Sequence, residues 1–157
     1  MADLPDSAAP RLREALAYWE RKRGKRQMPA RGEIRLGEVP AFVANLVLLA
    51  VEPMPLDFRF EFVGTAVRLK LGDIAGKRMS ELPAMAPGTR VFETWAAAVR
   101  GGRPHYVEAP YVARGGSVVS AQDMLMPLGN GDGAVEGLMV VLEFAVPVPG
   151  LRARSAA

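Results

Sequence analysis

The sequence predicts an α+β fold in which short helices cover one five-stranded antiparallel sheet. Three observations lead to this prediction. Residues 58–62 alternate aromatic and charged side chains, which is the pattern of a half-buried strand. Turn-forming segments at 114–116 and 130–133 divide the last third of the chain into three further strands. Between the early and late strands, residues 66–100 predict helical turns that end at glycines.

The composition indicates one globular domain, because half of the 157 residues are apolar and about a quarter are charged. The chain has no cysteine and a single histidine, which excludes disulfides, iron–sulfur clusters, thiol nucleophiles and poly-histidine metal sites within one chain. The longest apolar stretch, residues 42–51, is too short to span a bilayer. Residues 1–6 do not resemble a secretory signal, so we expect a soluble, cytoplasmic protein.

A first helix is expected before Gly24, with Asp6 or Ser7 as its cap and Pro10 in its first turn. Its apolar stripe consists of Leu12, Leu16 and Trp19. This stripe must be buried either on its own domain or on the same helix of a second chain. We expect it to form a homodimer or to dock a partner signalling protein.

Positive charge is concentrated near the N-terminus, where residues 11–35 hold nine Lys/Arg and three Glu. The densest part comprises Arg21, Lys22, Arg23, Lys25 and Arg26. Such a run could contact nucleic acid, an acidic partner or an anionic membrane. A solvated helix end is the simpler interpretation, and no second recognition helix follows at helix-turn-helix spacing.

Two strands are expected in the first half of the sheet. Residues 46–51 form a continuous apolar run, which is typical of a strand covered on both faces. A proline-rich turn at 52–57 connects it to the strand 58–63, whose aromatic side chains should share one face. Gly64 would end this strand, and Thr65 could cap the next helix.

The helical interval begins with residues 66–71, which Gly72 ends. Short turns follow, and then Thr89 precedes a clearer helix that reaches residue 100 and ends at the following glycine pair. The apolar stripe of that helix consists of Val91, Phe92, Trp95 and Val99. This helix should therefore pack on the sheet.

Strands at 104–113, 117–128 and 135–146 complete the predicted sheet as a meander, and residues 147–157 are expected to be a flexible tail. Asp123 lies between Ala121 and Leu125 on one face of its strand. A buried carboxyl there would need a partner, so an exposed face or a strand edge is the simpler interpretation.

The order of elements and several short motifs resemble the single-domain PAS proteins of the alphaproteobacterial PAS family over residues 12–145. The motifs are Tyr18-Trp19, Arg23-Gly24, Met28-Pro29, Val39-Pro40, Asn45-Leu46, Phe58-Arg59-Phe60, Val63-Gly64-Thr65, Leu71-Gly72, Ile74-Ala75-Gly76-Lys77, Gly102-Arg103-Pro104 and Met126-Pro127-Leu128. The chain departs from the family at Gln122-Asp123, where a basic residue is common.

This resemblance implies a PAS-like domain at 31–146, with short helices on one face of a five-stranded antiparallel sheet, preceded by a flanking helix and basic segment at 1–30. It also implies a sensory and interaction module with an internal pocket. The cofactor is unknown: His105 is a poor candidate for haem because it starts a strand, and flavin without a cysteinyl adduct stays open.

A pocket for a small, mostly apolar ligand is expected between the aromatic face of the sheet, the short helices and the longer helix. Methionines are frequent in these segments and suit an adaptable lining. The candidate lining consists of Phe60, Phe62, Met79, Met85, Trp95, Met124 and Met126.

The leading hypothesis is a non-catalytic sensory or regulatory module that signals through protein contacts. One alternative is a small α+β enzyme with an acidic pocket residue, for which Asp123 or His105 would have to face a polar cleft. The other is a nucleic-acid-associated regulator that acts through the basic segment, which we consider unlikely.

Overall fold

The computed structural model describes residues 4–129 and 133–145. Within these residues, three α-helices and four short 3₁₀ helices surround one sheet. The α-helices are α1 (Pro10–Arg23), α2 (Thr65–Leu71) and α3 (Arg90–Gly101), and the 3₁₀ helices are η1 (Arg31–Glu33), η2 (Leu36–Glu38), η3 (Val43–Asn45) and η4 (Met79–Glu81). The predicted tail at 147–157 lies outside the described residues.

The sheet consists of five strands, all paired in antiparallel fashion, in the order β2-β1-β5-β4-β3. The strands are β1 (Leu46–Pro53), β2 (Leu56–Val63), β3 (His105–Val112), β4 (Val118–Gly129) and β5 (Val135–Phe144). The predicted five-stranded antiparallel sheet and the α+β class are therefore confirmed. Because β1 pairs with β5, the early hairpin and the late meander join into a single sheet.

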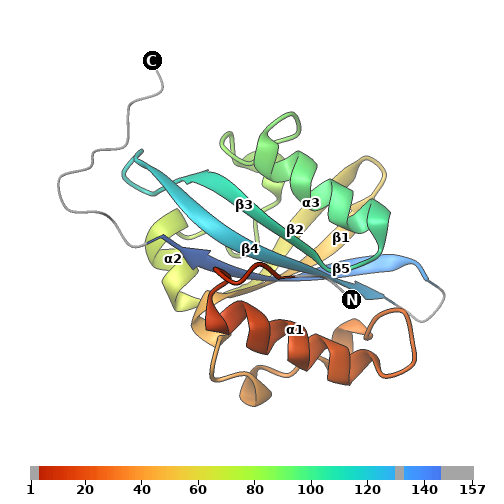
Figure 1. Ribbon diagram of the computed structural model, residues 1–157. Coiled ribbons are helices and arrows are strands. Elements are labelled where there is room, and N and C mark those ends of the chain that lie inside the picture. The colour runs from red at the N-terminus through yellow and green to blue at the C-terminus, as the bar shows by residue number, and fades with distance from the viewer. Residues whose placement is uncertain (1–3, 130–132, 146–157) are drawn as a thin grey trace.

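Helices cover both faces of the sheet, with α1 on one side and α3 on the other (Figure 1). The α1-side core contains Leu12, Ala15, Leu16, Tyr18, Trp19, Met28, Ile34, Val39, Phe42, Leu46, Met124, Met126, Leu128, Met139 and Val141. The α3-side core contains Val47, Leu49, Phe58, Phe60, Val67, Ile74, Met79, Met85, Val91, Phe92, Trp95, Ala96, Ala98, Ala109, Tyr111, Ala121, Leu125, Leu138, Val140 and Leu142. These two clusters divide the interior into two layers.

Strand β1 lies between the two layers and buries side chains on both of its faces, as its continuous apolar sequence predicts. Leu46 is buried in the α1-side core, whereas Val47 and Leu49 are buried in the α3-side core. The strand therefore contributes to both cores at once.

Strand β2 contains a bulge that changes the direction of its side chains. Leu48 of β1 pairs with Phe62 and the next residue, Leu49, pairs with Phe60, which leaves Glu61 without a partner on β1. A bulge residue breaks the strict alternation of faces. The expectation that Phe62 shares a face with Phe60 is therefore wrong: Phe60 is buried in the α3-side core, and Phe62 packs against the α1-side core.

The helix ends are only partly as expected. Thr89 caps α3 by accepting a hydrogen bond from the Phe92 amide at 3.2 Å, and Gly102 ends that helix with φ 63°. The expected N-terminal cap of α1, Asp6 or Ser7, is wrong, because Ala9 is the N-cap residue, whereas Gly24 is the C-cap as predicted. The Ala9 amide donates instead to the Gln122 side chain at 2.7 Å, so strand β4 supplies the missing acceptor.

Within the described ranges, no helix is long and apolar enough to cross a membrane. The proposed division at residue 30 stays a prediction. Helix α1 nevertheless packs closely on the sheet, since Leu12, Leu16 and Trp19 are all buried within their own chain.

Candidate functional site

The seven residues expected to line one pocket lie on opposite faces of the sheet. Four of them belong to the α3-side core, namely Phe60, Met79, Met85 and Trp95. The other three pack on the α1 side, namely Phe62, Met124 and Met126. The two groups cannot line one cavity, because the sheet separates them. Ligand binding by either group stays a prediction.

Strand alternation explains the position of the two β4 methionines. Met124 and Met126 face α1, whereas Asp123 and Leu125, one position away, are directed to the opposite face. The prediction that Asp123 shares a face with Ala121 and Leu125 agrees with the structure. The expectation that this face is exposed is wrong, because the Asp123 side chain is fully buried.

Trp95 of α3 lies over an aromatic floor formed by β2. Its ring meets those of Phe58 and Phe60 edge to face, with centroid distances of 6.3 Å and 6.2 Å. Such geometry is favourable for aromatic pairs and fixes the orientation of the indole. The Trp95 ring is therefore held between helix and sheet.

A polar cluster of three side chains lies inside this otherwise apolar core. Asp123 comes from β4, Tyr111 from β3 and Trp95 from α3. The Tyr111 hydroxyl donates a hydrogen bond to Asp123 Oδ2. Ala109 and Ala121 pair across the two strands between Tyr111 and Asp123, and their small side chains leave room for the tyrosine ring.

Burial dominates the electrostatics of the cluster. Desolvation raises the pKa of Asp123 well above its usual range, although the Tyr111 hydroxyl and the nearby Trp95 indole each oppose the shift. Burial also raises the pKa of Tyr111, and the neighbouring Asp123 carboxyl adds to this. Both groups therefore favour their neutral forms.

Two polar atoms of the cluster have no hydrogen-bond partner among the residues that the structure describes: Trp95 Nε1 and Asp123 Oδ1. The indole is close enough to influence the carboxyl, but no hydrogen bond of normal geometry joins them. Unpaired polar atoms in an apolar interior are rare and costly. They mark this cluster as the candidate functional site.

Sequence reasoning identified Trp95 and singled out Asp123, but it missed Tyr111. The register that places Tyr111 near Asp123 depends on the length of the turn between β3 and β4. The local signal that could have found it is the alternation of strand β3, which puts Tyr111 on the same face as Ala109.

The three residues assigned to a dimer or partner contact, Leu12, Leu16 and Trp19, are buried on the α1 side of their own sheet. The indole of Trp19 donates to the carbonyl of Pro127 in β4 at 2.8 Å. A partner contact through these side chains would therefore require α1 to leave the sheet. The role of α1 in partner binding stays a prediction.

Polar contacts hold the start of α1 to the sheet. Gln122 accepts from the Ala9 amide and donates to the Ser7 carbonyl at 2.9 Å. Arg11 pairs with Glu143 of β5 at 2.9 Å. Gln122, which occupies the position where related proteins were expected to carry a basic residue, thus connects β4 to α1.

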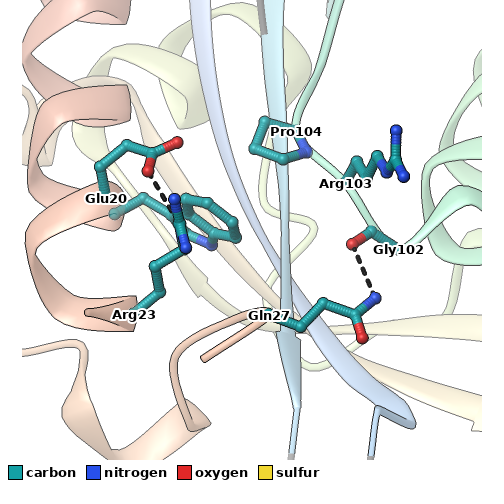
Figure 2. A pocket seen from close by; sticks show the side chains of 7 residues that line it. Glu20, Arg23, Gln27, Gly102, Arg103 and Pro104 are labelled. Atoms are coloured by element: carbon teal, nitrogen blue, oxygen red, sulfur yellow. Dashed lines mark hydrogen bonds and ion pairs between the residues drawn. The ribbon is translucent and has the colours of Figure 1, made fainter. Parts of the chain in front are cut away.

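A surface hollow of about 260 Å³ lies between the end of α1 and the loop after α3 (Figure 2). Its lining consists of Trp19, Glu20, Arg23, Gln27, Gly102, Arg103 and Pro104. Figure 2 shows that several of its polar groups pair with one another: Arg23 bonds Glu20 at 2.7 Å, and Gln27 bonds the Gly102 carbonyl at 3.3 Å. A ligand there would have to replace existing bonds, which makes the hollow the weaker candidate.

The basic segment is largely neutralised by neighbouring acids. Five of the nine cations in residues 11–35 form ion pairs with glutamates: Arg11, Lys22, Arg23, Arg26 and Arg31. Arg26 lowers the pKa of its partner Glu33 to about 2. This pairing weakens the case for a nucleic-acid surface. His105 is exposed at the start of β3, where it pairs with Leu125, two residues along β4 from Asp123.

A sequence profile described as PAS domain matches residues 8–142 of the chain. This match includes α1, the strands β1 to β4, and β5 up to residue 142. No curated protein sequence matches the chain.

Several solved structures have a similar fold. A Rhodobacter sphaeroides LOV protein superposes with a TM-score of 0.51 and 15% identity over 66% of this chain and 60% of its own. A Light-Oxygen-Voltage domain studied with a flavin analogue gives 0.50 and 18% over 66% and 78%. An RNA-binding Light-Oxygen-Voltage receptor gives 0.50 and 16% over 74% and 35%. The chain thus spans less than two thirds of the first and third of these proteins, and at such identities the likeness concerns the fold.

Proposed function

The chain belongs to the PAS domain family, and we propose that it is a non-catalytic sensory module that binds a small ligand in the α3-side core. The signal would leave through contacts with a partner protein or a second copy of the chain. The proposal joins the sensory role typical of the family with the polar cluster of this particular sequence.

One observation carries the proposal: Trp95 Nε1 and Asp123 Oδ1 are buried together, and neither forms a hydrogen bond of normal geometry with a residue that the structure describes. Each lost hydrogen bond costs about 1–3 kcal/mol in an apolar interior. A bound ligand that supplies the missing bonds would recover this free energy. Buried polar groups arranged in this way are how ligand sites obtain specificity within a mostly apolar lining.

The surrounding side chains suit an adaptable site. Met79 and Met85 pack in the same core as Trp95, and methionine side chains can change shape at low cost. Helix α2 has only seven residues, and η4 has three. Short elements of this kind open more easily than long helices, which would give a ligand access from the α3 side.

Strand β4 offers a route from the ligand site to the opposite face of the sheet. Asp123 faces the α3-side core, while the adjacent Gln122 holds the start of α1, and the Pro127 carbonyl accepts from Trp19. A shift of β4 on ligand binding would alter the contacts of α1. A partner protein could then recognise α1 or the surface that it covers.

The alternative of a small enzyme has less support. Asp123 has the raised pKa of many catalytic acids, but among the described residues only the side chains of Tyr111 and Trp95 are found to act on it. Its side chain is also fully buried, so a substrate would reach it only through the same opening of the covering helices that ligand binding requires. These features favour recognition over catalysis.

The test is to purify the protein, unfold it, and analyse the released small molecules by mass spectrometry. We expect one compound in near-stoichiometric amount, which Trp95→Phe loses and Trp19→Phe retains. The second variant is the matched control, because it changes the other tryptophan of the chain on the opposite face of the sheet. No released compound, or equal loss in both variants, would contradict the proposal.

A further inference from the structure

We propose that the end of the domain formed by α2 and the β3–β4 turn is a docking surface for an anionic lipid membrane. The surface consists of Arg68, Leu69 and Lys70 of α2 and Arg114 of the turn. Anionic headgroups would meet the three cations, and the leucine side chain would enter the boundary with the acyl chains. The proposal is independent of the ligand site in the α3-side core.

Leu69 occupies the centre of the solvent face of α2. Val67 is fully buried in the α3-side core and Leu71 packs partly against it, so the opposite side of the helix faces water. Successive helical residues are about 100° apart, which places Arg68 on one side of Leu69 and Lys70 on the other. The leucine is 74% exposed. A surface helix normally carries a polar residue at such a position, so this apolar one is available for a contact outside the chain.

The β3–β4 turn adds to the same surface. The Arg114 amide donates to the Lys70 carbonyl at 2.7 Å, which connects the turn to the last residues of α2. Val112 and Val118 pair across the two strands beside the turn, and both are exposed. Figure 1 shows α2 and this turn at the same end of the sheet. Three of the five exposed large apolar side chains found among the described residues therefore belong to this end.

The cations of this surface differ from those of the N-terminal basic segment, most of which are paired. None of the seven ion pairs found among the described residues includes Arg68, Lys70 or Arg114. Both arginines are exposed, and Lys70 is half-buried. Asp73, which follows α2, offsets only one of the three positive charges. Exposed charges of one sign complement a surface of the opposite sign, which here is an anionic one.

The projecting leucine favours a membrane over the other anionic partners. A folded protein partner obtains its affinity from well-packed, fitted side chains at the centre of the contact. A bilayer accepts a projecting aliphatic side chain without a matching pocket. Nucleic acid would use the cations and leave the leucine in water. A membrane uses the charge and the apolar side chain together.

Binding is measured by co-sedimentation with vesicles of phosphatidylglycerol and phosphatidylcholine in equal amounts, and with vesicles of phosphatidylcholine alone. We expect the wild type to bind only the mixed vesicles and to dissociate at high salt, because surface charges are then screened. Arg68→Gln/Lys70→Gln should lower the partition coefficient about tenfold or more, since each cation near an anionic surface contributes roughly a factor of five. Leu69→Gln should lower it several-fold, because it removes the apolar contact.

Two matched controls make the same chemical changes elsewhere. Lys25→Gln/Arg100→Gln removes two exposed cations that take part in none of the ion pairs found among the described residues. Lys25 follows α1 and Arg100 belongs to the last turn of α3, and these helix ends lie at the other end of the sheet from α2 (Figure 1). Met54→Gln replaces an apolar side chain that is 92% exposed. Both controls should bind the mixed vesicles as the wild type does.

No binding to the mixed vesicles would overturn the proposal. Equal loss in Lys25→Gln/Arg100→Gln would do the same, because positive charge anywhere on the molecule would then suffice. Full binding by Leu69→Gln would also contradict it. Poly-L-glutamate is the probe for an acidic protein: if the wild type binds it through Arg68 and Lys70 but does not bind the vesicles, the surface belongs to such a protein and the membrane is excluded.

Discussion

At the level of single residues, burial and hydrogen bonding act in opposite directions on Asp123. Burial raises the pKa of its carboxyl, and the contacts from Tyr111 and Trp95 lower it by less. The net effect is a raised pKa for a carboxyl in the core of a protein whose other acids lie mostly at the surface. This imbalance has a measurable consequence for stability.

Asp123→Asn should change how stability depends on pH. The folded pKa is raised above the unfolded value near 3.9, so the folded wild type keeps a proton that the unfolded chain releases between these two pKa values. The wild-type free energy of unfolding should therefore fall as the pH rises through this window, by at most about 1.4 kcal/mol per pH unit. Urea unfolding of both proteins from pH 4.5 to 8 measures the difference.

The comparison of Asp123→Asn with the wild type cancels the contribution of the surface acids, because groups such as Glu33 are present in both proteins. Parallel pH profiles would show that Asp123 is ionised in the folded protein. That outcome would contradict the prediction that Asp123 is neutral in the folded protein.

The two tryptophans should respond differently to the same change. Trp19→Phe removes an indole that donates to the Pro127 carbonyl, and it leaves that carbonyl unpaired. Trp95→Phe removes an indole N–H that forms no hydrogen bond of normal geometry with any of the described residues. In protein refolded without the ligand, we therefore expect Trp19→Phe to cost about 1 kcal/mol more than Trp95→Phe in urea unfolding. The reverse order would show that Trp95 Nε1 is hydrogen-bonded in the folded protein.

At the level of elements, close backbone approach fixes the junction of β2 and α2. A Cβ atom at Gly64 would lie 2.4 Å from the carbonyl oxygens of Val43 and Ala44, although the φ of Gly64 is −65° and suits any residue. The glycine is thus required by packing and not by its backbone angles.

Gly64→Ala should destabilise the protein by about 2 kcal/mol or more, because the two carbonyls belong to the backbone and cannot move aside easily. Gly101→Ala is the matched control: a Cβ there meets nothing within 4 Å, and alanine favours the helix. Thermal or urea unfolding compares the two. Equal stability of both variants would mean that the junction can relax without cost.

The hydrogen bonds from Gln122 to the start of α1 give a second prediction at the level of elements. Gln122→Ala removes both bonds to the start of α1, so amide hydrogen exchange should accelerate in residues 8–14 and stay unchanged in α3. Ser120→Ala, at an exposed position of the same strand, should leave the exchange unaltered. If Gln122→Ala leaves the protection of residues 8–14 intact, the apolar stripe and the Arg11–Glu143 pair hold the helix without Gln122.

The strands and the longer helices could be predicted because their signals are local. The alternation at 58–62 and the Thr89 cap both lie within a few residues of the element they define. The bulge at Glu61 could not be predicted, because it depends on pairing with β1 and not on the sequence of β2. The acceptor for the Ala9 amide could not be predicted either, since Gln122 is 113 residues away in the sequence.

At the level of the whole molecule, the sheet is covered on both faces, and its two edges are partly blocked. Pro110 interrupts the donors of β3, and Arg90 donates to the Glu108 carbonyl at 3.2 Å. On the other edge, the backbone of Phe60 bonds Gly76 and Lys77. A second chain would therefore have to associate through helices or side chains, because extension of the sheet is hindered.

The fold class followed from the order of elements, but the candidate site was only half predictable. Trp95 and Asp123 were both singled out, because an aromatic helix stripe and a carboxyl in an apolar strand are visible in the sequence. Their meeting depends on how α3 lies across β4, which no local pattern encodes. The position of Tyr111 depends likewise on the register of β3.

The central claim is that the polar cluster beneath α3 is the ligand site of this PAS domain. The most direct test is to record the two indole N–H signals by ¹H–¹⁵N NMR in the protein as purified, and again after unfolding, removal of the small molecule and refolding. The account predicts that the Trp95 signal changes and the Trp19 signal does not. A Trp95 signal at the same position in both samples would contradict it.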